Sequence, residues 1–508
     1  MRVSSMNRRQ FGALGAAGFA AMAFGGRDSA DAADAELVAA YGSIGPSRHP
    51  WQQFAGQVDY TVAYLFFDSL LNYDEQGCII PSLAESYEVR SLERVRLRIR
   101  DGVTFHNGQK MTVEDVKYSL EESLNPDTTF IASYFKRWLD HVEIIDSRTI
   151  ETVAKVPYRS VPELLAYISF VYPAGTPIKD YKVPVGTGPY TFVEFIPNNR
   201  VVAVRNDNYW RPKARFSKVT LRQIPESATR MAALVAGEID FAESISIDDV
   251  PVVEKAGREI VSVGSNSQMY VTFNRTAPGP MQDVRVRQAV NYAIDKDSIR
   301  KVFYGGMAGE AQGPYADHVP YFNAKLTRYA YDPKKAKAML AEAGFANGFE
   351  TTLATSNNRY LKDSEVAQVI AGQLQEVGIR TKLYTADFVT YQQAVRDDRD
   401  NKTGKFGLYL QGWATQWADP DVAFGCFETG GRWNFGGFDS PRVMELLKRG
   451  RQTLDQEELA KIYGEIQDIL WDSEAQCVGI CFVPYIAGVS KKLSGWKLRP
   501  TEIQQWGV

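Results

Sequence analysis

Cysteine, histidine and unbalanced charge are all scarce in this 508-residue chain, and each shortage excludes a class of protein. Four cysteines are too few for the disulfide framework of a small secreted scaffold. Cys477 and Cys481, at i and i+4 of a probable strand, would lie about 13 Å apart and could not bridge directly. The net charge of -3 shows no excess of basic residues, which binding to nucleic acid or to an anionic membrane would require. The histidines lie far apart and share no metal-ligand spacing: His49, His106, His141 and His318.

Motifs of common enzyme classes are also missing. The chain contains no G-x-S-x-G, no H-E-x-x-H and no glycine-rich phosphate loop. We therefore expect no enzymatic activity and no metal centre. Folding can still bring distant residues together, so an exported hydrolase acting on peptides is the alternative from a different functional class. The oxidation state of Cys78 and Cys426 is left open.

The N-terminus carries the features of an export signal. The arginine pair at 8–9 precedes an uncharged run at 12–25, and small residues in an A-x-A pattern follow up to Ala35. The uncharged run has about 14 residues, whereas a bilayer-spanning helix needs about 20. This order predicts a signal peptide, and the paired arginines resemble a twin-arginine signal. We expect residues 1–35 to be removed on export, and no later window is apolar enough to span a membrane.

Strand and helix patterns alternate along the rest of the chain. Residues 93–100 alternate apolar and arginine side chains, which predicts a strand with a solvated basic face, although four arginines could also bind anions. Residues 191–195 and 201–204 predict a hairpin. This alternation predicts an α/β fold, and the length predicts two or three domains. Helices are expected to begin at Thr112, Ser227, Asp283, Asp332 and Ser440, and three to end at Gly237, Gly344 and Gly378.

The segment around residue 410 is a candidate ligand site. Residues 406–411 alternate apolar side chains with glycine and polar ones and predict a strand, which ends at Gly412-Trp413. The following loop contains Trp417 and Asp419-Pro420-Asp421. Indole rings supply apolar area and polar groups fix orientation, so this strand end suits a small-molecule site. The alternative is that both tryptophans are core residues with satisfied indole N–H groups.

Several short motifs occur in order along nearly all of the mature chain. They are 81–87, 100–108 running into 112–116, 185–190 with 205–210, 236–240, 283–295 and 412–413. In this order they resemble the extracytoplasmic solute-binding proteins of ABC importers, in the peptide/nickel-binding family (family 5). Each motif alone is weak, but the shared order is specific.

The resemblance implies an α/β, two-lobed periplasmic binding protein of the class II type, with an extra small domain in the N-terminal lobe. The chain would cross between lobes near 268–273 and 478–485, and ligand would lie between lobes that close over it by a hinge motion. The expected division is 36–68, 185–267 and 484–508 for the main domain of lobe 1, 69–184 for its extra domain, and 268–483 for lobe 2.

The resemblance also implies a function. Such a protein would be the periplasmic component of an ABC importer and would deliver a captured peptide or peptide-like solute to a membrane permease. It would be a monomer without a cofactor or a nucleic-acid partner. A nickel- or haem-binding member of the same family is the nearer alternative, with His49 and His318 as its natural ligands. A periplasmic sensor partner would share the fold, and the sequence does not distinguish it.

Peptide-binding members of this family place an aspartate soon after the Gly-Trp pair, where it meets the α-ammonium of the peptide. In this chain that position is Gln416, which can hydrogen-bond but cannot neutralise a buried ammonium. Either Asp419 or Asp421 acts instead, or the ligand has no free α-amine. The alternative role of these two aspartates is to shape the loop.

Arg359 lies where related sequences place an arginine that grips a ligand carboxylate, and a bidentate guanidinium suits that task. An interdomain salt bridge is its alternative role. A carboxylate clamp without an ammonium partner predicts a modified peptide, an N-substituted amino acid such as an opine, or a sugar-containing conjugate. Further candidate ligand residues are Trp413, Trp417, Trp433, Asn434 and Tyr270, with Ser43, Arg48 and His49 as weaker ones.

Overall fold

The computed structural model describes residues 35–45, 49–52, 57–74, 77–128, 132–317, 319–357, 359–414, 419–499 and 503–507. Nearly all of the expected signal peptide lies outside these residues. Four of the residues singled out in the sequence also lie outside them: Arg48, His318, Gln416 and Trp417. Within the described parts of the chain, no helix is both long and apolar enough to cross a membrane.

A mixed sheet of ten strands, among the described residues, runs through the whole molecule. Its long central strands, β12 and β16, pair antiparallel with each other. In spatial order the strands are β14 (Ile379–Ala386), β13 (Phe349–Ser356), β15 (Leu408–Ala414), β12 (Glu259–Phe273), β16 (Cys477–Val489), β11 (Phe241–Glu243), β1 (Glu36–Tyr41), β10 (Lys218–Gln223), β9 (Arg200–Arg205) and β8 (Tyr190–Ile196).

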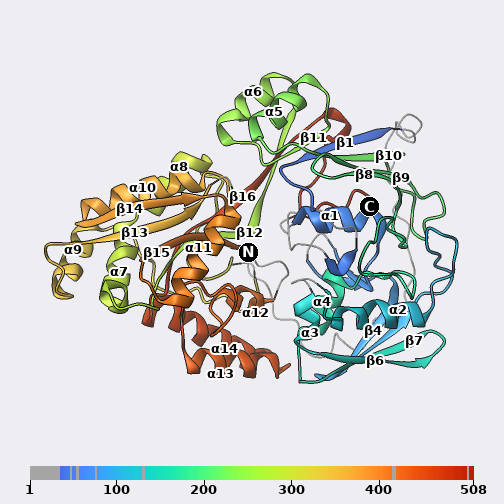
Figure 1. The fold of residues 1–508 in the computed structure, drawn as a ribbon, viewed down its shortest axis with the longest axis horizontal. Helices are drawn as coiled ribbons and strands as arrows, with labels where there is room; N and C mark the ends of the chain where they lie inside the picture. The colour runs from blue at the N-terminus through green and yellow to red at the C-terminus, as the bar shows by residue number, and fades with distance from the viewer. Residues whose placement is uncertain are drawn as a thin grey trace.

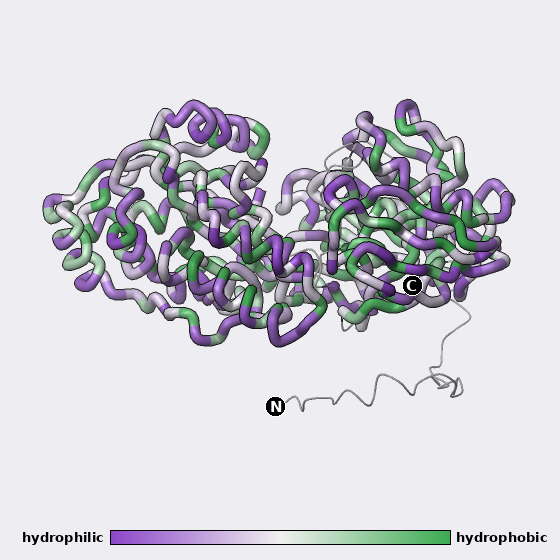
Figure 2. The backbone as a smooth tube through the Cα atoms, turned by 90° about the horizontal axis from the view of Figure 1, so that it is seen from below, coloured by the Kyte–Doolittle hydropathy of each residue, from purple (hydrophilic) through white to green (hydrophobic). Residues whose placement is uncertain are grey.

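The central strands divide this sheet into two lobes (Figure 1). We call the side with β1 and β8–β11 lobe 1 and the side with β13–β15 lobe 2. The register between β12 and β16 shifts between Gly264 and Gln268, so the ladder is interrupted where the chain passes from one lobe to the other. Figure 2 shows two masses joined by a narrower waist. The predicted α/β fold is therefore confirmed, and it has two lobes.

Strand β16 is buried along its entire length. It contains no charged residue, as expected for a strand that is covered on both faces. Cys477 and Cys481 are buried on it, and all four cysteines are unpaired thiols in the structure. The expectation that these two would not bridge is confirmed.

Lobe 1 carries a second, four-stranded antiparallel sheet with the order β4-β5-β7-β6. The arginines of β5 face glutamates: Arg94 pairs with Glu143 and Glu151 at 2.9 and 2.6 Å, and Arg98 pairs with Glu85 at 2.7 Å. This basic face is therefore a half-exposed sheet surface with its own counter-ions. The strands are β4 (Ala84–Ser91), β5 (Arg94–Ile99), β6 (Leu139–Asp146) and β7 (Thr149–Ala154), and a small hairpin, β2 (Leu71–Tyr73) with β3 (Ile79–Pro81), lies nearby.

Helices cover the sheets, and most expected start signals are confirmed. Thr112 forms a reciprocal capping box with Asp115. Ser227 is the exception: it is the first helical residue rather than the cap, because its hydroxyl donates to the distant Ser244 carbonyl at 2.9 Å. The helices of lobe 1 are α1 (Gln57–Phe66), α2 (Val113–Glu121), α3 (Ser133–Lys136), α4 (Val161–Ile168), α5 (Ser227–Ala236) and α6 (Val250–Lys255).

The side chains of Asp283, Asp332 and Ser440 also cap helices, as expected. Gly237 ends α5 in the left-handed conformation with φ of 81°. The helices of lobe 2 are α7 (Val284–Ala293), α8 (Lys296–Tyr304), α9 (Pro333–Glu342), α10 (Asp363–Glu376), α11 (Phe388–Asn401), α12 (Pro420–Ala423), α13 (Pro441–Arg451) and α14 (Gln456–Asp468).

The buried carboxylate of Asp68 binds residues of the sequence motifs at 185–190 and 205–210. Asp68 accepts hydrogen bonds from the Thr187 hydroxyl at 2.9 Å, the Tyr209 hydroxyl at 2.8 Å and the Trp210 indole at 2.9 Å. Three donors compensate for the removal of this charge from water. Gly188 must lack a side chain, because a Cβ there would lie 2.4 Å from the Phe66 carbonyl carbon. These two motifs therefore hold lobe 1 together.

Candidate functional site

The loop that follows β13 presents Arg359. The buried carboxylate of Asp363 shapes this loop, because one oxygen accepts hydrogen bonds from Ser356 Oγ and from the backbone N–H groups of Arg359 and Tyr360, at 2.8 to 3.2 Å. The Arg359 guanidinium lies 5.1 Å from the ring centres of both Tyr360 and Phe388. It makes no hydrogen bond or ion pair with any described residue, and the side chain is exposed. Among the described residues, the Arg359 side chain is therefore held by two aromatic rings and has no counter-ion.

Tyr360 connects this loop to the end of β15. Its hydroxyl donates to the Gly412 carbonyl at 3.0 Å, and a Cβ on Gly412 would lie 2.3 Å from its ring. The glycine of the Gly-Trp pair is thus required by the close approach of this ring. Trp413 follows directly; its indole donates to the Val422 carbonyl at 2.9 Å, and its ring lies 6.0 Å from that of Trp433. Arg359 and the two tryptophans are therefore linked at one end of lobe 2.

The Arg359 loop faces lobe 1 next to the crossing strands. Lys362 forms an ion pair with Asp248 of lobe 1 at 2.8 Å, and Leu361 packs against the hydrophobic cluster under α5. Glu243, the last residue of β11, accepts a hydrogen bond from the Gly42 N–H at 3.1 Å. Burial raises its pKa, and Arg230 and Arg359 partly offset that rise. Arg359 thus acts electrostatically on a carboxyl group of the other lobe.

Sequence reasoning missed Glu243. A strand was expected at residues 239–241, but nothing in its pattern marks the carboxyl group that follows. A possible signal was its place at the carboxyl end of a strand beside β1, where ligand sites of open α/β sheets gather.

Asp419 does not face open space. It caps α12, and its carboxylate binds Arg159 Nη2 of lobe 1 at 2.6 Å and the Ser160 hydroxyl. Asp421 is paired with Arg451 at 2.8 Å. Both aspartates are almost fully buried and are committed to arginines.

Two further predicted ligand residues lie inside lobe 2. The Tyr270 side chain is buried, and its hydroxyl accepts a hydrogen bond from the Gln411 amide at 2.9 Å. Asn434 donates to the carbonyls of Glu428 and Phe438 and accepts from the Phe438 N–H. These contacts stabilise the interior and the glycine-rich loop of the lobe.

The weaker candidates of lobe 1 are separated. Ser43 is exposed just after β1, whereas His49 is buried between the rings of Tyr172 and Tyr181. Burial lowers the pKa of His49 to about 4. Among the described residues, no group of three or more histidine, cysteine or acidic side chains is arranged to hold a metal ion.

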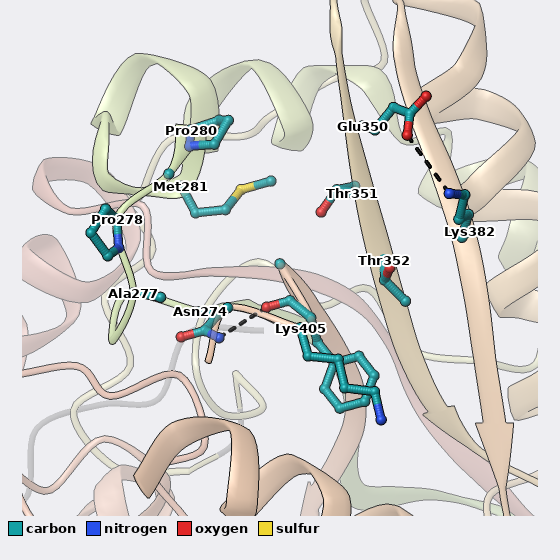
Figure 3. Close-up of a pocket in the computed structure, with 14 residues that line it drawn as sticks. Asn274, Ala277, Pro278, Pro280, Met281, Glu350, Thr351, Thr352, Lys382 and Lys405 are labelled. Atoms are coloured by element: carbon teal, nitrogen blue, oxygen red, sulfur yellow. Dashed lines mark hydrogen bonds and ion pairs between the residues drawn. The ribbon is translucent and has the colours of Figure 1, made fainter. Parts of the chain in front are cut away.

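A hollow of about 250 Å³ lies elsewhere in lobe 2 (Figure 3). It is lined by the start of β13, by Lys382 of β14 and by the segment before α7, and Glu350 pairs with Lys382 at its rim at 3.7 Å. Met281 and Thr351 point toward each other across it. The seven residues of β13 from Glu350 to Ser356 span roughly 20 Å, so the hollow is at the opposite end of the strand from Arg359.

Comparison with known proteins identifies the family. Residues 79–435 match the sequence profile of the bacterial extracellular solute-binding proteins, family 5. The chain belongs to this family. The glutathione-binding protein GsiB of Pectobacterium atrosepticum is 30% identical over 478 residues, which cover 92% of each chain. GsiB of Escherichia coli K12 is 28% identical over 485 residues, again 92% of each chain.

Solved structures of family 5 members share the fold. CtaP of Listeria monocytogenes superposes with a TM-score of 0.82 at 22% identity and covers 93% of this chain and 98% of its own. DppA of Helicobacter pylori, solved with the peptide STSA, gives 0.78 at 24% identity, with 92% and 97% covered. AgaA from A. tumefacien R10, solved with agropinic acid, gives 0.78 at 25% identity, with 93% and 97% covered. These relatives are binding proteins, and the chain is a family 5 solute-binding protein of an ABC importer.

Proposed function

We propose that this protein captures a peptide-like solute bearing a carboxylate in the bacterial periplasm and delivers it to an ABC permease. The observation that supports the ligand class is the guanidinium of Arg359, which has no ion pair among the described residues and lies over two aromatic rings in the loop whose Lys362 pairs with lobe 1. A bidentate arginine recognises a carboxylate through two parallel hydrogen bonds. The proposed site comprises Arg359, Trp413 and Trp433 from lobe 2, whereas the predicted ligand residues Gln416 and Trp417 lie outside the described residues.

The ammonium end of an ordinary peptide has no partner at Asp419, because that carboxylate is already bound by Arg159 and Ser160. The charge of Arg359 partly offsets the rise that burial causes in the pKa of Glu243 in the other lobe. Glu243 is therefore the residue we assign to any amine of the ligand. A modified peptide such as glutathione fits this arrangement, because its γ-linkage displaces the amine from the usual end. The names of the GsiB relatives and the agropinic acid bound to AgaA support the same class.

Isothermal titration calorimetry on the purified mature protein tests this proposal, with glutathione, agropinic acid and an unmodified dipeptide as separate probes. We expect micromolar binding of glutathione or agropinic acid and none of the dipeptide. Arg359→Ala should weaken binding at least tenfold, or about 1.4 kcal/mol, because it removes a charge-assisted contact. Arg380→Ala is the matched control, since Arg380 lies on the same lobe in an exposed pair with Glu350. Micromolar binding of unmodified dipeptides would refute the assigned class.

A further inference from the structure

The two lobes touch at a second place, far from the Arg359 loop. Arg159, just before α4 of lobe 1, donates to Asp419 at 2.6 Å, to the Tyr463 hydroxyl at 3.0 Å and to the Gly450 carbonyl at 3.3 Å. Its own backbone N–H donates to the Arg451 carbonyl at 2.8 Å. In Figure 1 this is where α3 and α4 approach α12, α13 and α14. The arginine side chain is 10% exposed and that of Asp419 is 1% exposed, so water is nearly excluded from the pair.

A second bridge lies beside the first. Arg137 of lobe 1 reaches Glu428 at 3.2 Å and Asp421 at 3.6 Å, and Arg451 binds the same two carboxylates from within lobe 2. Three arginines and three carboxylates therefore meet at the contact, counting Arg159 and Asp419, and two of the arginines come from lobe 1. A balanced and hydrogen-bonded cluster tolerates burial, whereas removal of one member leaves an uncompensated charge. These ion pairs join residues of lobe 1 directly to residues of lobe 2, so they hold the two lobes together at this place.

Glu163, in the first turn of α4, is a further carboxyl group that this balance of three arginines and three carboxylates does not include. Its Oε2 atom is shielded from solvent and has no hydrogen-bond partner among the residues that the structure describes. Burial and the nearby Asp419 raise its pKa to about 7, and Arg159 offsets only part of that rise. The other titratable groups near it are the hydroxyls of Tyr73 on β2, Tyr87 on β4 and Tyr321, all with raised pKa values and therefore neutral. Strand β3, which also packs on α4, has no titratable residue.

We propose that Arg159, Asp419 and the carboxyl group of Glu163 form a proton-dependent latch that closes the two lobes without ligand. When the lobes separate, water reaches both carboxylates and each can remain ionised. On closure Arg159 is bound to Asp419, while Oε2 of Glu163 is shielded from solvent without a hydrogen-bond partner among the described residues, so a neutral Glu163 is favoured. Closure therefore takes up a proton, and ionised Glu163 opposes it through repulsion from Asp419.

The sign of the pH dependence follows from this linkage. The pKa of Glu163 is about 7 in the closed form and about 4.5, the ordinary value, when solvated. The stabilisation of the closed form is fully present below the lower value and is lost as the pH rises through 7. Between pH 6 and pH 8 the closing equilibrium should fall by about tenfold.

Distance measurements on the unliganded protein test the latch. Spin labels are attached at Lys155→Cys and Lys461→Cys, which are exposed positions of the two lobes, in a Cys78→Ser background. Pulsed electron paramagnetic resonance then measures the distance between the labels and so the closed fraction. We expect a short distance at pH 6 that gives way to a longer one toward pH 8. Glu163→Gln, which is uncharged and of the same size, should remain closed across this range. Arg159→Ala should be open at both pH values.

Arg98→Ala is the matched control, because it removes an exposed arginine from the same lobe and leaves the contact untouched. The proposal is overturned if Glu163→Gln keeps the pH dependence of the parent, or if a folded Arg159→Ala variant is as closed as the parent. Should Arg159→Ala not fold, Glu163→Gln decides alone. None of these measurements uses a ligand, so their failure is distinguishable from failure of the proposed ligand class.

Discussion

Replacing Gly412 with alanine should disturb lobe 2 through a single ring. The added Cβ would lie 2.3, 2.6 and 2.9 Å from three atoms of Tyr360, whereas ordinary contact begins near 3.4 Å. The ring must move by about 1 Å, which costs about 1–3 kcal/mol as overpacking. Loss of the hydrogen bond from the Tyr360 hydroxyl to the Gly412 carbonyl adds about 1 kcal/mol. We expect the free energy of unfolding to fall by about 2–4 kcal/mol in total.

Urea denaturation followed by tryptophan fluorescence measures this change, and a double-mutant cycle identifies its cause. In a Tyr360→Ala background the ring is absent, so Gly412→Ala should cost less than about 0.5 kcal/mol. Gly372→Ala is the control within the same lobe: that glycine is exposed in α10 and has no neighbour near its Cβ position, so the change should stabilise by about 0.5–1 kcal/mol. An equal cost of Gly412→Ala in both backgrounds would refute the reasoning.

Two further predictions concern lobe 1. Asp68→Ala should lower the free energy of unfolding by about 3–5 kcal/mol, because three buried donors lose their acceptor; thermal and urea unfolding would measure it, and an effect below about 1 kcal/mol would contradict it. His49, whose pKa is lowered to about 4, must take up a proton on unfolding at acid pH. Stability contributed by its neutral form is present above pH 6.5 and lost as the pH falls toward 4, by at most about 3 kcal/mol. His49→Leu should flatten that part of the pH–stability curve relative to the parent, and an unchanged slope would argue against it.

Local chemistry made part of the fold predictable. The capping box at Thr112 and the N-cap at Asp283 lie within three residues of the groups they satisfy, so the sequence displays them directly. A strand was also predicted correctly at residues 406–411, but β15 runs on to Ala414 and residues 408–411 are all buried, so the alternation in the sequence does not mark one buried and one exposed face. The prediction that Ser227 caps a helix was wrong because its hydroxyl donates to the carbonyl of Ser244, which is 17 positions away.

The candidate site was harder to predict from the sequence, because the residues that make its main contacts are far apart along the chain. Asp419 and Arg159 are 260 residues apart, and the sequence near either residue gives no indication of their contact. Asn434 looked like a ligand group in a glycine-rich loop, yet its amide closes the turns of that same loop. Arg359 shows the opposite case: its side chain forms no ion pair among the described residues, and the sequence around it gives no sign of this.

The last residues of the chain have a consequence for how the molecule is made. The indole of Trp506 donates to the Tyr41 hydroxyl at 3.1 Å, and its carbonyl accepts from Tyr190 at 3.2 Å. Its ring also packs on Phe241 at 5.2 Å. Residues 503–507 must therefore be made before lobe 1 can close its core, although strand β1 of that core stands near the start of the sequence. Lobe 2 is instead built mainly from the stretch between β12 and β16.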